Sequence, residues 1–256
     1  MYKIFKRVCA YLIDILIIMT LTQCLSSTTI FNPNLNKYQK YNQQYLDSYT
    51  EYANTITNLE KYYQDNKLTE KEYNKLIKLS SKYTDTINKY YQDNKLTKKN
   101  HDKLIKEISN SFQKESSKTY YLVEKNSISE KVIYLILVIL YFIGFNYITN
   151  GQTLGKKLMR IRIKNTTKEN KVSLVSYLIR VVLMYQTIYY IVRLIAILFV
   201  SSNDYTNITN IAYSVQNMLD LLIISCMLLR KDGRGLHDIL AKTKVIGIDR
   251  KGIEEQ

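Results

Sequence analysis

The sequence predicts an all-α membrane protein, a four-transmembrane-helix bundle with a long extracytoplasmic, hairpin- or coiled-coil-like helical insert between the first and second spans. Four apolar segments and one long polar region predict this class, and the whole-chain mean hydropathy of -0.21 averages the two populations. The densest basic clusters flank the apolar segments, as the positive-inside rule expects of a membrane protein. The net charge of +15 is therefore no sign of a nucleic-acid partner.

We expect the chain to divide into four parts. Residues 1–30 carry the first transmembrane helix, and residues 31–130 form the polar helical insert. Residues 131–248 hold the second to fourth helices with basic cytoplasmic loops, and residues 249–256 are a tail.

The first apolar segment runs from Phe5 to Leu25 and contains one acid, Asp14, with Arg7 at its entrance. About 18 apolar residues are close to the ~20 that cross the hydrocarbon core. A carboxylate in such a segment usually faces other helices or water, so we expect a polar stripe facing the bundle interior. The alternatives are a plain anchor and a cleaved signal peptide, although no A-x-A-like cleavage site follows.

The remaining spans follow from the hydropathy pattern. Val132–Thr149 is the second span, Val181–Val200 the third, and approximately Asn210–Leu229 the fourth. Arg180 precedes the third span near the headgroups, and a short polar loop, Ser201–Asn207, separates the last two. Alternation of the basic loops places both termini and the 150–171 loop in the cytoplasm, with the insert outside.

The insert contains an internal repeat, in which residues 61–78 recur at 89–106, a shift of 28 residues. In each copy one helix ends, a QDNK turn follows, and another helix begins. Thr69 is a predicted N-cap, with Glu72 completing a capping box, and only the cap survives at Thr97 in the second copy. Amphipathic helical hairpins are the main interpretation, and a peptide- or wall-binding role is the alternative.

The 150–171 loop carries seven basic residues against one acid. Thr153 can cap a short amphipathic helix that lies at the lipid surface, and residues 160–164 alternate like a short strand. Its glycines do not have the spacing of a phosphate-binding loop.

Charged and polar residues also occur inside the predicted spans. When each span is centred, Asp14, Arg193 and Asp220 fall in one thin slab, and Gln216 lies one turn from Asp220. Two hypotheses remain open, a buried ion pair that orients the helices and a proton or cation site.

Three separated motifs together resemble the RDD family of bacterial membrane proteins. They are Arg7-x-x-Ala10-x-x-x-Asp14, the segment Gly151-Gln152-Thr153-Leu154-Gly155-Lys156-Lys157, and the segment 235–241 with Asp238. The resemblance covers residues 1–30 and 131–248, and it implies that Arg7, Asp14 and Asp238 are the arginine and aspartates that name the family. It also implies a loop motif at Gly151, Thr153 and Gly155, and a weak expectation of ion or cation/proton transport. Lys242, where members often have glycine, is a small departure.

We expect Arg7 and Asp238 to meet at the inner rim of the bundle. Gly233 and Gly235 let the chain turn back toward the membrane after the fourth helix. Asp238 then caps a helix or forms a bidentate pair with a base. Arg7 is the first candidate for this base, and Arg160 and Arg162 are the alternatives. In the simpler alternative, Asp238 is only a helix-start acid and Arg7 only an inside-positive anchor.

The function that these observations favour is transport of ions, protons or cations through the charged intramembrane site. The alternative is a non-catalytic membrane scaffold or anchor that displays the helical insert outside the cell. No nucleophile–base pair, metal cluster or cofactor motif occurs in the sequence, so we expect no enzyme activity, metal or cofactor. The expected partners are the lipid bilayer, a second copy of the chain and a protein that binds the insert, with no nucleic acid, in the cell membrane.

Overall fold

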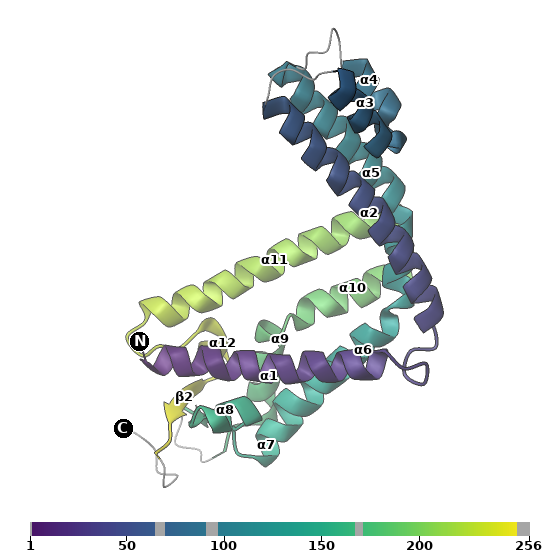
Figure 1. The fold of residues 1–256 in the computed structure, drawn as a ribbon. Helices are drawn as coiled ribbons and strands as arrows, with labels where there is room; N and C mark the ends of the chain where they lie inside the picture. The colour runs from purple at the N-terminus through teal and green to yellow at the C-terminus, as the bar shows by residue number, and fades with distance from the viewer. Residues whose placement is uncertain (1, 65–69, 91–96, 167–170, 250–256) are drawn as a thin grey trace. The chain divides into compact units, whose positions relative to one another are not determined.

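The computed structural model describes residues 2–64, 70–90, 97–166 and 171–249 (Figure 1). The chain divides into two compact units, a membrane unit of residues 1–35 with 127–256 and an insert unit of residues 36–126.

The membrane unit is built from apolar helices. They are α1 (Tyr2–Ser26), the run α6 (Ile128–Ile139), η2 (Leu140–Phe145, a π-helix) and α7 (Asn146–Ile148), then α9 (Leu174–Met184), α10 (Thr187–Phe199) and α11 (Ser202–Leu229). Among the described residues, three helices, Ile4–Ser26, Ile128–Ile148 and Ser202–Leu229, are long and apolar enough to cross a membrane, or four if α9 and α10 form one bent span. Only about a fifth of each apolar window is buried in the protein, as suits helices surrounded by lipid.

The predicted third span is wrong as a continuous helix, because α9 and α10 meet at a bend of 71°. Helices of 11 and 13 residues extend ~16 and ~20 Å, so neither crosses ~30 Å of hydrocarbon alone. The break falls at Gln186, whose φ is 52°. Side chains satisfy the backbone there: Tyr134 Oη donates to Tyr185 O at 2.9 Å, and Thr187 Oγ1 donates to Val181 O at 2.9 Å. A broken helix in apolar surroundings needs such replacement hydrogen bonds.

The predicted loop Ser201–Asn207 is also wrong, because α11 begins at Ser202. Ser201 is its N-cap and accepts a hydrogen bond from Asp204 N at 3.4 Å. The polar residues of this stretch therefore start a helix, and the Ser and Asp that suggested a loop are residues that favour the first turn.

A two-stranded antiparallel sheet joins the loop after α7 to the C-terminal part of the chain. The strand predicted at 160–164 is confirmed as β1 (Ile161–Asn165), and it pairs with β2 (Thr243–Gly247), with Ile163 opposite Val245. The short helices α8 (Leu154–Leu158) and α12 (Leu236–Leu240) precede the two strands. The strand β2 was not predicted, and the predicted all-α class lacks this small sheet.

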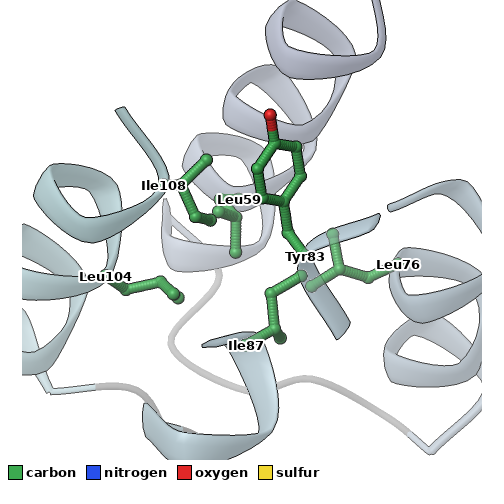
Figure 2. Close-up of a cluster of buried hydrophobic side chains, with 6 residues drawn as sticks. All are labelled: Leu59, Leu76, Tyr83, Ile87, Leu104 and Ile108. Carbon is green, nitrogen blue, oxygen red and sulfur yellow. The ribbon is translucent and has the colours of Figure 1, made fainter. Parts of the chain in front are cut away.

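The insert unit comprises α2 (Leu35–Gln64), α3 (Glu70–Leu79), η1 (Ser81–Tyr83, a 3₁₀ turn), α4 (Thr84–Tyr90) and α5 (Lys98–Asn126). Figure 2 shows its core, which contains Leu59, Leu76, Tyr83, Ile87, Leu104 and Ile108. Two pairs in this core, Leu59 with Ile87 and Leu76 with Leu104, are related by the 28-residue shift of the repeat. Equivalent positions of the repeat thus fill one shared core.

The predicted cap of the second repeat is confirmed, since Thr97 Oγ1 accepts from Asn100 N at 3.3 Å. The predicted cap Thr69 of the first repeat lies outside the described residues.

Candidate functional site

Asp14 is held by the loop that follows α7, in a cluster that we call the Asp14 cradle: Asp14, Tyr141, Thr153, Gly155 and Lys156. The carboxylate is 1% exposed. It accepts hydrogen bonds from Tyr141 Oη at 2.7 Å, from Gly155 N at 2.8 Å, and from Thr153 Oγ1. Lys156 Nζ lies 3.9 Å from Asp14 Oδ2 and 3.0 Å from Thr153 Oγ1. The acid of the first span is therefore paired with a base of the predicted cytoplasmic loop.

The glycines of this loop are explained by close approach. A Cβ on Gly155 would lie 2.3 Å from Ala10 O and 2.8 Å from Asp14 Oδ1, so only glycine lets α8 reach α1. Gly151 has a φ of +89°, and a Cβ there would lie 2.3 Å from Ile163 O of β1. Thr153 caps α8 as predicted, accepting from Lys156 N at 3.5 Å.

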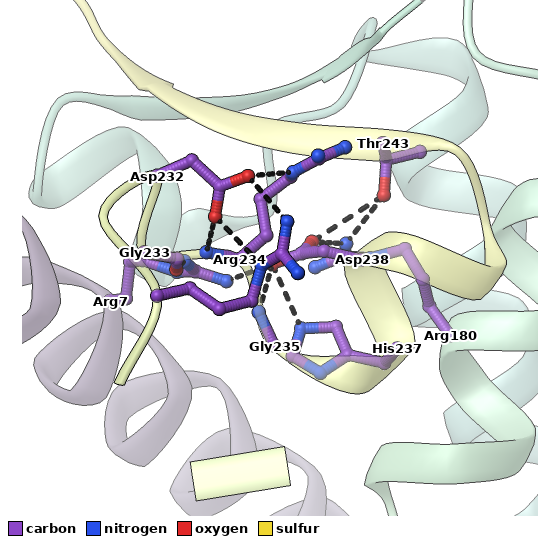
Figure 3. Close-up of polar contacts among 10 residues, drawn as sticks. Arg7, Arg180, Asp232, Gly233, Arg234, Gly235, His237, Asp238 and Thr243 are labelled. Carbon is purple, nitrogen blue, oxygen red and sulfur yellow. Dashed lines mark hydrogen bonds and ion pairs between the residues drawn. The ribbon is translucent and has the colours of Figure 1, made fainter. Parts of the chain in front are cut away.

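Asp238 is the centre of a second cluster, the Asp238 clamp: Arg7, Arg180, Gly235, Asp238 and Thr243 (Figure 3). Its carboxylate is fully buried, and its two oxygens pair separately with the guanidinium groups of Arg7 and Arg180. Arg7 also donates to the backbone oxygen of Gly233, and Arg180 donates to Thr243 Oγ1 at 2.8 Å. The carboxylate accepts from Gly235 N at 3.3 Å, so Asp238 caps α12 as well.

Charge and burial set the protonation states in both clusters. Burial alone would raise the pKa of Asp238, but the charges of Arg180 and Arg7 outweigh it and hold the pKa well below its usual range. Burial lowers the pKa of His237 to about 3, with Arg180 acting in the same direction, so this imidazole is neutral. Burial lowers the pKa of Lys156 to about 7, against the opposing effect of Asp14. Lys156 therefore titrates near neutral pH.

A cavity of about 450 Å³ lies beside both clusters. Asp14, Lys156, Arg7 and Arg180 line it, and so does Asp220 of α11. The half-buried Asp220 accepts a hydrogen bond from Gln216 Nε2 at 3.1 Å, and no ion pair to it exists among the described residues.

The predicted contact of Arg7 with Asp238 is confirmed, and so is the capping role of Asp238. The bidentate geometry is wrong, because each carboxylate oxygen takes a different arginine. Arg180, expected at the headgroups, is the second partner, in place of the rivals Arg160 and Arg162. The signal for it was that Arg180 is the only charged residue in the apolar stretch 172–192.

The residues predicted to share one slab, Asp14, Arg193 and Asp220, do not pair with one another in the structure. Asp14 and Asp220 do line the same cavity, but Asp14 takes its base from α8 rather than from Arg193. The Arg193 guanidinium lies over the rings of Tyr189 and Tyr190, at 5.1 and 5.7 Å. Depths calculated from straight, centred spans could not include a loop that folds back onto α1. Lys156, Tyr141 and Thr243 were not predicted as site residues.

The apolar helices define the class of the protein as a membrane protein. Its Asp14 cradle and Asp238 clamp are buried among the elements of the membrane unit. The sequence profile of the RDD family matches residues 113–242, about half of the chain, and the chain belongs to this family. No match was found among curated proteins or among solved structures.

Proposed function

We propose that the membrane unit exchanges protons or cations through the cavity beside the Asp14 cradle. The observation that carries this proposal is the buried pair of Asp14 and Lys156 on the wall of a cavity that Asp220 also faces. Intramembrane ionisable groups that face a cavity are typical of ion and proton pathways.

The chemistry of the pair fits proton exchange. A protonated Lys156 neutralises Asp14, and release of one proton into the cavity leaves a neutral amine beside a carboxylate that still has three hydrogen-bond donors. The carboxylate of Asp220 supplies a second negative group that lines the cavity. A pKa of about 7 for Lys156 means that both protonation states are populated near neutral pH.

Proton flux into liposomes that hold the purified full-length protein tests this proposal. We expect Lys156→Met and Asp220→Asn to abolish flux and Lys157→Met, on the same helix but exposed, to retain it. Each variant is first checked for an unchanged elution volume and helical content. Wild-type flux in correctly folded Lys156→Met would overturn the proposal.

A second candidate function is a scaffold that displays the insert. It is supported by the insert unit, which is compact and has its own hydrophobic core. A fragment of residues 36–126 serves as bait in a pull-down from cell-envelope extract, with Leu104→Asp as an unfolded control. A protein that binds the folded fragment and not the control supports display, and binding to neither counts against it.

A further inference from the structure

Apolar residues of two helices line the cavity of the membrane unit where it opens to the outside. They are Ile4, Val8 and Leu12 of α1, and Ile224, Met227 and Leu228 of α11. Val8, Leu12, Ile224 and Leu228 are 45%, 56%, 53% and 65% exposed. These residues belong to helices that qualify as membrane spans, so the groove between them faces the region of the acyl chains.

The polar end of the same cavity is basic. The side chains of Arg7, Lys156 and Arg180 line it and are 12%, 9% and 7% exposed. The acids paired with them are Asp14 and Asp238, so three bases and two acids lie together at this end, and Asp220 is a third acid that lines the cavity. Contacts with described residues use two of the five N–H donors of Arg7, which leaves donors for a ligand.

His237 adds an independent sign of a missing ligand. It lines the cavity and is 1% exposed, and within the described part of the chain neither ring nitrogen has a hydrogen-bond partner. Its Nε2 lies 3.4 Å from Asp238 Oδ2, a contact that Figure 3 marks with a dashed line and that would be an ion pair only if the imidazole were protonated. Buried polar atoms in native proteins are nearly always satisfied by protein, water or ligand.

We propose that this cavity binds an anionic phospholipid with a hydroxylated headgroup. The acyl chains lie in the groove between α1 and α11, and the phosphate lies against Arg7, Arg180 and Lys156. A headgroup hydroxyl donates to Asp220, which lines the same cavity. The bases at the polar end bind the phosphate, Asp220 accepts the hydrogen bond of the headgroup hydroxyl, and the lipid-facing rim gives access from the bilayer. This inference goes beyond proton exchange and does not rest on it.

Binding is measured on the full-length protein in detergent, by native mass spectrometry with three added compounds. Phosphatidylglycerol carries both the headgroup and the chains, phosphatidylcholine has chains without net charge, and glycerol 3-phosphate has the headgroup without chains. We expect phosphatidylglycerol to bind about tenfold or more tightly than phosphatidylcholine, which is ~1.4 kcal/mol, and glycerol 3-phosphate not to bind. Equal affinity for the two lipids, or binding of glycerol 3-phosphate as tight as that of phosphatidylglycerol, would overturn the proposal.

Two matched pairs of variants locate the site. Leu12→Trp fills the groove from the lipid-facing side of α1, and we expect it to weaken phosphatidylglycerol binding about tenfold (~1.4 kcal/mol). Leu16→Trp is the control, because Leu16 is 65% exposed on the same helix and does not line the cavity. Lys156→Gln should remove the preference for the anionic lipid, and Lys157→Gln should keep it. Unchanged binding in both Leu12→Trp and Lys156→Gln rules out this cavity as the lipid site.

Discussion

At the scale of single residues, Asp238 is a group on which contacts from several elements converge. It joins α1 through Arg7, α9 through Arg180, and the start of α12 through Gly235. Three segments far apart in sequence therefore share one carboxylate. Removing one partner of a buried pair leaves an uncompensated charge, which costs ~3–5 kcal/mol.

We predict that Asp238→Asn lowers the free energy of unfolding by ~3–5 kcal/mol. Thermal unfolding followed by circular dichroism should show this as a strongly lowered unfolding temperature. Asp232→Asn is the matched control, since Asp232 pairs with Arg230 and Arg234 at the exposed surface, and it should leave the unfolding temperature near that of the wild type. In a double-mutant cycle with Arg7→Gln, we expect a coupling energy of about 1 kcal/mol or more. Additive losses would mean that Arg7 and Asp238 do not stabilise each other.

Gly155 is the second residue whose substitution has a definite expected cost. Its alanine variant would force α8 away from Ala10 and Asp14, and overpacking of this kind costs ~1–3 kcal/mol. Gly144→Ala is the control, because no atom lies within 4 Å of a Cβ there, and a gain of up to ~1 kcal/mol is expected from helix propensity. Equal thermal unfolding of the two variants would contradict the close approach of α8 to α1.

Lys156 predicts a pH dependence of stability. Its pKa falls from 10.5 to about 7 on folding, so between these values the unfolded chain binds more protons, and the folded protein becomes more stable as the pH rises. Relative to Lys156→Met, the free energy of unfolding of the wild type should rise by up to ~1.4 kcal/mol for each pH unit between the two pKa values. Circular dichroism melts measure it, since the chain has no Trp, and Lys157→Met should follow the wild type. Parallel curves for the wild type and Lys156→Met would refute the buried, titrating lysine.

At the scale of elements, the sequence was informative where a pattern is local. Hydropathy located α1, the run α6 to α7 and most of α11, and alternation located β1. It could not locate the bend at Gln186, because the groups that satisfy the break, such as Tyr134, come from another helix. For the same reason it could not name Lys156 as the partner of Asp14, since that contact depends on α8 folding back onto α1.

The bent pair α9 and α10 leads to a prediction about span number. In a background in which Cys9, Cys24 and Cys226 are replaced, Lys171→Cys and Asn203→Cys place exposed thiols before α9 and after α10. If the pair forms one broken span, a membrane-impermeant maleimide should label Asn203→Cys on intact cells and Lys171→Cys only after permeabilisation. Labelling of both sites only after permeabilisation would make the pair a re-entrant loop and the four-span count wrong.

At the scale of the whole molecule, three separate segments of the membrane unit contact one another. The N-terminal half of α1, the loop with α8 and β1, and the segment with α12 and β2 are joined by the Asp14 cradle, the Asp238 clamp and the two-stranded sheet. These are the three segments for which the basic residues predict a cytoplasmic location. Their mutual contacts support placing them on one side of the membrane, as alternation of the loops requires.

The insert unit has a separate core, so we predict that residues 36–126 fold alone. Circular dichroism of this fragment in water should show a helical spectrum and a cooperative thermal transition, because Leu59, Leu76, Ile87 and Leu104 bury one another within the unit. Leu76→Ala and Leu104→Ala occupy equivalent positions of the repeat, and each should cost ~2–5 kcal/mol.

The exposed Lys103→Ala is the control for these two core variants and should leave the transition unchanged. A coil spectrum of the fragment would show that the insert needs the membrane unit to fold. A transition unaffected by Leu104→Ala would show that the two copies of the repeat do not share one core.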